Sequence, residues 1–226
     1  MGEKKEKNKI DTENLKNETV EAAKKVKETI KGTSIKEDTK NTKNFILEMI
    51  KNPLEKLKEV ATDNSNKFFK TAIMLIIVWT LLIFIGSTYS TIYYWGFTRV
   101  FRNILIVLKN ILSPTIGILV YSIIVLMLNK KNKKSLTTII SNITITQIPL
   151  ILSTLASLLT IISTNMSLLT KPFASLCLTI ATILGYFGFK NLFGEEGSKT
   201  FIKKYVLIQS IYYIAYILIG LLGIYI

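Results

Sequence analysis

The sequence contains no histidine and a single cysteine, and both shortages narrow the functions open to it. Without histidine there is no Ser-His-Asp triad, no imidazole ligand for zinc and no histidine proton relay. Cys177 is alone, so the chain has no disulfide framework and no Cys-x-x-Cys site. Neither a Walker A motif nor a GxGxxG motif occurs, so nothing supports a nucleotide site. An enzyme is therefore not expected, and no catalytic residue, cofactor or metal site is predicted.

Acidic residues are missing from most of the chain. No Asp or Glu lies between Asp63 and Glu195, which removes the carboxylates of aspartyl intramembrane proteolysis and of carboxylate-coupled ion pumping. Residues 1–70 hold 17 Lys and 13 Asp or Glu, whereas residues 71–226 hold the other 12 Lys and Arg and only two acidic residues. The apolar part is thus also the basic part, with its charges in short clusters between uncharged runs. This pattern is typical of a polytopic membrane protein, whereas a nucleic-acid binder would spread Lys and Arg over a folded face.

Three regions are expected along the 226 residues. Residues 1–43 are a hydrophilic, partly disordered N-terminal region, in which Thr33–Thr42 is interpreted as a polar linker. Residues 44–66 are interpreted as amphipathic lead-in helices, and residues 67–226 as a transmembrane domain. The expected fold class is all-α, a polytopic integral membrane protein with five transmembrane helices and amphipathic N-terminal helices.

Two short helices are expected in the lead-in region, at Asn44–Lys51 and Pro53–Thr62. Asn52 suits the N-cap of the second, with Pro53 at its first position and Glu55 three residues after the cap. Apolar residues share one side, namely Ile46, Met49, Ile50, Leu54, Leu57 and Val60. Basic helices of this kind beside a membrane span lie in the headgroup layer, so the expected partners are the lipid bilayer and its anionic headgroups. A solvated lead-in is the alternative, other membrane proteins remain open as partners, and no nucleic acid is expected.

Five apolar runs are expected to span the membrane, at about Thr71–Tyr89, Ser113–Leu128, Leu136–Thr164, Pro172–Lys190 and Lys204–Ile226. The third run is too long for a straight span, and Pro149 at its centre predicts a bend. Pro172 is expected in the first turn of the fourth span. An interfacial helix at Thr98–Leu112 is expected to lead into the second span at Pro114.

Lysine and arginine clusters in the short loops predict the orientation of the spans. The clusters on the expected cytoplasmic side are Lys67 and Lys70, Lys130, Lys131, Lys133 and Lys134, and Lys190, Lys199, Lys203 and Lys204. The N-terminus is then cytoplasmic and the C-terminus outside, in a multi-pass protein of a cell membrane, interpreted as a bacterial plasma membrane.

Small and polar residues recur at helical spacing in the last three expected spans. The candidate residues for helix packing or for a polar face are Asn142, Thr146, Pro149, Ser153, Thr160, Gly185, Gly188, Gln209, Tyr212, Tyr216 and Gly220. Small residues let helices approach closely in lipid, and hydroxyls can bond across the contact, so packing is the main interpretation. The alternative is a polar groove or substrate path that uses Asn142, Thr146, Gln147 and Gln209.

One known family has a similar arrangement. The stretch Ile50-Lys51-Asn52-Pro53-Leu54-Glu55-Lys56-Leu57, followed by Lys67-Phe68-Phe69-Lys70-Thr71-Ala72 and the first span, resembles bacterial members of the Yip (Ypt/Rab-interacting protein) membrane family. The resemblance covers about residues 44–226, but the Asp-Leu-Tyr-Gly-Pro element of eukaryotic members is absent. It implies five membrane helices and a non-enzymatic scaffold or adaptor in membrane organisation or trafficking. The alternative function is a small transporter or channel component that uses the polar faces of spans three and five.

Overall fold

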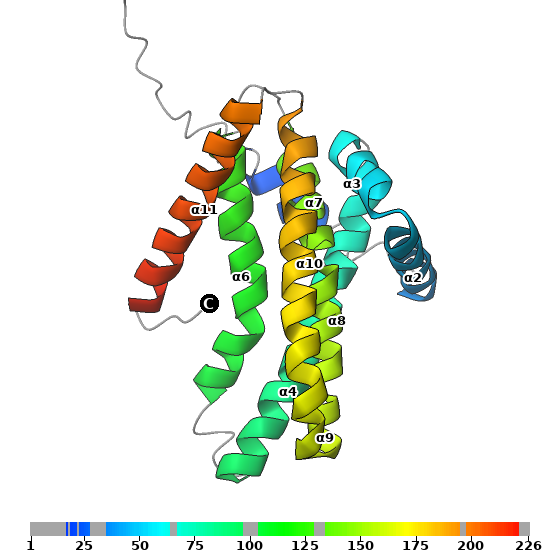
Figure 1. Ribbon diagram of the computed structural model, residues 1–226, viewed down its shortest axis with the longest axis vertical. Coiled ribbons are helices and arrows are strands. Elements are labelled where there is room, and N and C mark those ends of the chain that lie inside the picture. The colour runs from blue at the N-terminus through cyan, green and yellow to red at the C-terminus, as the bar shows by residue number, and fades with distance from the viewer. Residues whose placement is uncertain are drawn as a thin grey trace, which may run out of the picture.

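The computed structural model describes residues 17, 19–21, 23–27, 35–63, 67–96, 104–128, 134–194 and 198–221. Every regular element within these residues is a helix, which confirms the predicted all-α class. Long helices stand side by side in a bundle, and two shorter helices, α2 (Ile35–Lys51) and α3 (Pro53–Thr62), lie against one flank of it (Figure 1).

Three helices are long and apolar enough to cross a membrane, namely α4 (Lys67–Trp95), α6 (Ile104–Leu128) and α10 (Ser167–Phe193). At 1.5 Å per residue, α10 is about 40 Å long, more than the hydrocarbon core of a bilayer. Only 22%, 22% and 28% of the residues in their most apolar windows are buried within the protein, so most of these side chains are at least partly exposed. This apolar exterior is compatible with a membrane environment.

A bent pair of helices makes a fourth candidate span. Here α7 (Leu136–Thr146) is followed by α8 (Ile148–Ser157), a short α9 (Leu159–Ile162) and a 3-10 turn, η2 (Thr164–Met166). The direction of the helix changes by 45° at the break. Pro149 has no N–H to offer the carbonyl of Ile145, so the ladder is interrupted and Gln147 adopts φ −88° and ψ 1°. The bend predicted from Pro149 is therefore confirmed.

The fifth expected span corresponds to α11 (Ser198–Leu221). Its last residues, 222–226, lie outside the described residues, so the count of five spans stays a prediction. The bundle has one basic end, where α4, α7 and α11 begin and α6 and α10 end (Figure 1). The lysines at or beside these helix ends are Lys67, Lys70, Lys134, Lys190, Lys199, Lys203 and Lys204.

Two expected helix starts differ from the structure. Within the described residues, the expected interfacial helix is not separate from the second membrane helix, because α6 runs unbroken from Ile104 to Leu128 with Pro114 inside it. Likewise α10 begins at Ser167, so Pro172 lies at its sixth position rather than in its first turn. Each proline removes one backbone hydrogen bond, a loss that long apolar helices in packed bundles tolerate. Residues 98–103 of the expected interfacial helix lie outside the described residues.

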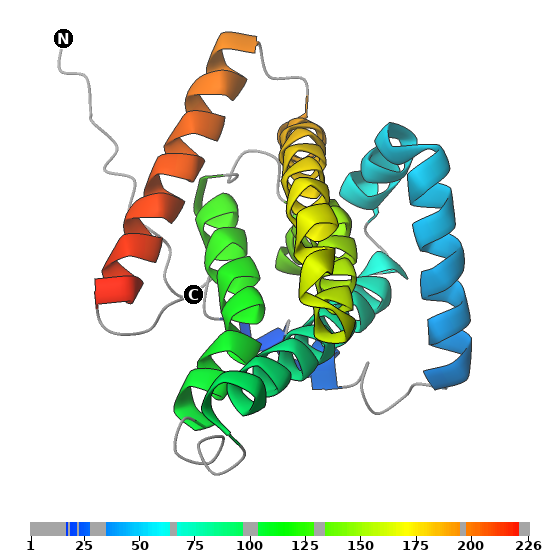
Figure 2. The same ribbon diagram turned by 60° about the horizontal axis from the view of Figure 1, so that its bottom comes forward.

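The lead-in helix α2 begins at Ile35, so part of the expected linker Thr33–Thr42 is helical. Thr42, Phe45 and Met49 lie on one face of α2 and are buried, and their burial accounts for the longer helix. In Figure 1 α2 is seen nearly end-on, and in Figure 2 at full length, so it crosses the long direction of the bundle. Asn52 occupies the N-cap of α3 as predicted, but its side chain makes no capping hydrogen bond.

Apolar contacts fix α2 and α3 to the bundle. The rings of Phe45 in α2 and Phe68 in α4 lie 5.4 Å apart, and Leu57 and Val60 of α3 are fully buried in the same cluster. The hydroxyl of Thr138 in α7 donates to the carbonyl of Asp63, 3.0 Å away, just after α3 ends. Much of the apolar side of α2 and α3 therefore contacts protein, and contact with lipid headgroups stays a prediction.

A chain of ion pairs links the same three helices. Lys56 Nζ of α3 lies 2.7 Å from Glu48 of α2 and 2.8 Å from Glu59, which in turn lies 3.5 Å from Lys67 Nζ of α4. The hydrogen bonds that Lys56 donates to the carboxylates of Glu48 and Glu59 raise the pKa of Lys56, and the bond that Glu59 accepts from Lys56 lowers the pKa of Glu59. All four side chains are partly exposed, so the chain of pairs orients the helices more than it stabilises them.

Candidate functional site in the helical bundle

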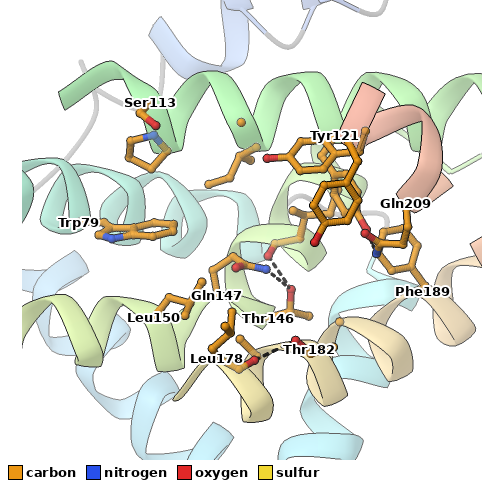
Figure 3. Close-up of a pocket in the computed structure, with 18 of the residues that line it drawn as sticks. Trp79, Ser113, Tyr121, Thr146, Gln147, Leu150, Leu178, Thr182, Phe189 and Gln209 are labelled. Atoms are coloured by element: carbon orange, nitrogen blue, oxygen red, sulfur yellow. Dashed lines mark hydrogen bonds between the residues drawn. The ribbon is translucent and has the colours of Figure 1, made fainter. Parts of the chain in front are cut away.

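A half-open cavity of about 650 Å³ lies between α4, α6, the bent pair α7–α8, α10 and α11. Figure 3 shows side chains from these helices converging on it. Its volume lies in the range of sites that bind small molecules. In the part of the chain that the structure describes, no residue that lines the cavity is charged. The cavity therefore suits an uncharged molecule, because a lone ion in such a place would lack a counter-charge.

The break between α7 and α8 supplies one polar side of the cavity. Gln147, the residue at the break, donates from Nε2 to the hydroxyl of Thr146 over 3.3 Å, and both side chains line the cavity (Figure 3). The Thr146 hydroxyl donates its hydrogen to the carbonyl of Ile143, 2.7 Å away. Pro149 thus acts on the cavity indirectly, because the break that it causes occurs at Gln147.

A cluster of aromatic rings with one glutamine forms the side of the cavity nearer the basic end. Gln209 of α11 donates from Nε2 to the hydroxyl of Tyr121 in α6 (Figure 3). The Tyr121 ring packs edge-on against Phe189 of α10 at 5.3 Å and against Tyr212 of α11 at 4.8 Å. Edge-to-face packing of this kind is favourable for aromatic pairs, so these rings hold α6, α10 and α11 together.

Trp79 of α4 marks the opposite side. Its indole Nε1 donates to the hydroxyl of Thr154 in α8 over 3.0 Å, which ties α4 to the lower half of the bent pair. The rest of the wall is mainly apolar, with Ile118, Ile143 and Leu150 among the lining residues. An apolar wall with a few convergent polar groups is the usual composition of a small-molecule site.

Two glycines of α10 have opposite roles, although they are three residues apart. A Cβ added at Gly188 would lie 2.6 Å from Asn142 Oδ1 and 2.9 Å from Thr146 Cγ2, so α7 and α10 approach closely here. A Cβ added at Gly185 would meet nothing within 4 Å, because this residue lines the cavity. Gly188 is thus a packing residue at the contact with α7, whereas Gly185 leaves space for the cavity. A packing role was expected for both glycines, and the structure places only Gly188 in one.

The structure brings together several of the residues singled out in the sequence. Thr146, Gly185, Gln209 and Tyr212 line the cavity, together with Gln147. Thr160 lines a second cavity near the end of α4. The remaining positions lie elsewhere: Asn142, Pro149 and Gly188 are buried between helices, Ser153 is half-buried and lines neither cavity, and the side chains of Tyr216 and Gly220 lie outside the described residues.

Sequence reasoning missed Trp79, Asn110, Tyr121 and Phe189, which also line the cavity. Trp79 and Tyr121 are hidden in uniformly apolar runs, where no periodicity separates an inner face from an outer one. A signal did exist for the aromatic cluster, because Tyr186, Phe189 and Phe193 recur at three- and four-residue steps on α10.

No family model matches this chain, and neither a curated protein nor a solved structure is similar to it. The resemblance to the Yip family thus stays a prediction, and the site is interpreted from its own geometry.

Proposed function

We propose that this chain is a non-enzymatic, multi-pass membrane protein whose helical bundle binds a small uncharged molecule, as a transporter or carrier component would. The observation that carries the proposal is the cavity of about 650 Å³, where Thr146 and Gln147 of the bent pair and Gln209 of α11 line the same space. Its polar lining consists of hydroxyl, phenol, carboxamide and indole groups, which are uncharged hydrogen-bonding groups that suit an uncharged ligand.

The topology that we propose has five spans, with the N-terminus on the cytoplasmic side of a bacterial plasma membrane and the C-terminus outside. The lysines of the basic end support this orientation, because short cytoplasmic segments are enriched in Lys and Arg. Among the described residues near the opposite helix ends, the corresponding lysines are Lys109 and Lys171. Reporter fusions after Lys134 and after Ile226 should give opposite signals, and equal signals would contradict the topology.

Cysteine labelling tests the binding cavity directly. In a Cys177→Ser background, Gly185→Cys places a thiol on the cavity, and Leu184→Cys places one in the buried cluster that packs against α3. We expect a small neutral methanethiosulfonate to label Gly185→Cys at least tenfold faster than Leu184→Cys in the full chain in lipid nanodiscs. Equal rates would mean that the cavity does not admit small molecules, and the proposal would fail.

A scaffold or adaptor of the Yip type is the second candidate. It is favoured by a patch on α2 and α3, formed by Leu47, Ile50 and Leu54, which are 49%, 62% and 49% exposed. A patch of this kind beside exposed lysines suits a membrane surface or another membrane protein. In nanodiscs of rising anionic lipid content, trypsin cleavage after Lys51 and Lys58 should slow if the patch lies on the bilayer, and an unchanged rate would argue against it.

A further inference from the structure

A second cavity, of about 860 Å³, lies at the end of the bundle opposite the basic end. It is lined by the C-terminal part of α4, by α8 and α9, by Asn110 of α6 and by Ser167 of α10. Hydroxyl groups dominate its polar lining, from Ser87, Ser90, Thr91, Ser157, Thr160 and Ser163. The rings of Tyr89 and Tyr93 stack beside them with centroids 5.9 Å apart.

The two cavities adjoin. Ile83 and Asn110 line both of them, and the hydrogen bond between Trp79 and Thr154 joins a residue that lines the first to one that lines the second. Asn110 Nδ2 also donates to the hydroxyl of Ser87 over 3.4 Å, which connects α6 to α4 at this junction. A single elongated molecule could therefore occupy both cavities.

Three hydroxyl groups of the second cavity, those of Thr91, Ser157 and Thr160, present acceptors rather than donors. Thr91 donates its only hydroxyl hydrogen to the carbonyl of Ser87, Ser157 to that of Thr154, and Thr160 to that of Ser157, over 2.8, 2.7 and 2.6 Å. Each oxygen keeps lone pairs for another partner. A ligand that suits such a lining carries several hydrogen-bond donors of its own.

The charge of the lining residues further limits the class of ligand. Among the described residues that line the two cavities there is neither an acid nor a base, so a bound cation or anion would lack a counter-charge. We propose that the ligand is a neutral amphiphile with a polyhydroxyl headgroup, an inference that rests on the proposed binding function. The headgroup occupies the hydroxyl-lined cavity, and the apolar chain passes Ile83 into the cavity beside Trp79.

Protection of the Gly185→Cys thiol tests this ligand class. The protein, with Cys177→Ser and Gly185→Cys, is held in nanodiscs and treated with octyl glucoside, octyl sulfate or octyltrimethylammonium, which share the same chain. Octyl glucoside should half-protect the thiol at a concentration at least tenfold lower than either charged analogue. Glucose alone should give no protection, because the chain is what reaches Gly185.

Variants of the second cavity give the matched control. Thr160→Val and Ser157→Ala each remove one acceptor at little or no change in volume, and each should weaken protection by octyl glucoside roughly fivefold. Thr179→Val changes an exposed threonine of α10 that lines neither cavity, and it should have no effect.

The outcomes separate this inference from the function on which it rests. Equal protection by all three amphiphiles, protection by glucose alone, or no protection by any of them overturns the polyhydroxyl amphiphile while the binding cavity stands. If Thr160→Val and Ser157→Ala weaken protection by octyl glucoside no more than Thr179→Val does, the headgroup site is overturned. Failure of the reagent to label Gly185→Cys at all overturns both the cavity and its ligand.

Discussion

The contact between α7 and α10 gives the sharpest test of the packing, because α10 supplies its own control. Gly188→Ala places a methyl group where Asn142 Oδ1 would be 2.6 Å and Thr146 Cγ2 2.9 Å away. Asn142 is 1% exposed and lines neither cavity, so its side chain cannot move away from the new methyl group without displacing its neighbours. Gly185→Ala adds the same methyl group to the same helix, three residues earlier, with nothing within 4 Å.

Two opposing contributions set the change in the free energy of unfolding. Overpacking a tight contact costs about 1–3 kcal/mol, and replacing glycine by alanine inside a helix contributes about 0.5–1 kcal/mol of stability. The helix term is common to both variants and cancels in their difference. Gly188→Ala should therefore be about 1–3 kcal/mol less stable than Gly185→Ala, which itself should be slightly more stable than the parent chain.

Unfolding in detergent, followed by the fluorescence of Trp79 in a Trp95→Phe background, measures this difference. The double variant Asn142→Ala with Gly188→Ala should recover part of the loss, because the shortened side chain vacates the position of the new methyl group. Equal stability of Gly185→Ala and Gly188→Ala would refute the close approach of α7 and α10. A double variant whose losses simply add would refute Asn142 as the obstructing group.

Three further predictions concern other contacts. Gln209→Leu and Tyr121→Phe should each lower the free energy of unfolding, and their double-mutant cycle should give a coupling of about 0.6 kcal/mol; zero coupling would argue against the hydrogen bond. Because the pKa of Glu59 is lowered in the fold, its pairing with Lys56 stabilises the protein above the ordinary carboxyl pKa, and this stabilisation is lost as the pH falls through the lowered value. In thermal unfolding, the stability of Lys56→Gln should therefore fall less on acidification than that of the parent chain, by about a few tenths of a kcal/mol. Gly194 ends α10 at φ 70° and ψ −157°, a region that only glycine adopts readily, so Gly194→Ala should cost about 1–3 kcal/mol in the same unfolding assay, and a neutral result would contradict this backbone conformation.

The sequence predicted the long apolar helices and the bend, because both follow from local chemistry. Uninterrupted apolar runs require helices where lipid surrounds them, and this rule located α4, α6 and α10. Pro149 predicted the break in the third span because a missing N–H has the same consequence in any helix. Pro114 and Pro172 carry the same defect, yet α6 and α10 continue through them. A proline alone therefore does not decide whether a helix ends.

The roles within the candidate site could not be assigned from the sequence. Gly185 and Gly188 belong to one stripe of small residues, and which of them packs depends on where α7 crosses α10. The apolar side of α2 and α3 suits protein and lipid equally well, since amphipathicity indicates that a face is buried without identifying its partner. Phe45 and Leu57 contact the bundle, whereas Ile50 remains exposed.

The neutral lining of the two cavities also has an electrical consequence. A unit charge that crosses a membrane does work of about 2.3 kcal/mol per 100 mV, so a site that binds ions is coupled to the membrane voltage. Among the described residues no charge lines either cavity, and an uncharged ligand carries none into them. On the proposed function, occupancy of the bundle by such a ligand is independent of voltage, and any transport of the ligand follows its own concentration gradient unless another component supplies energy.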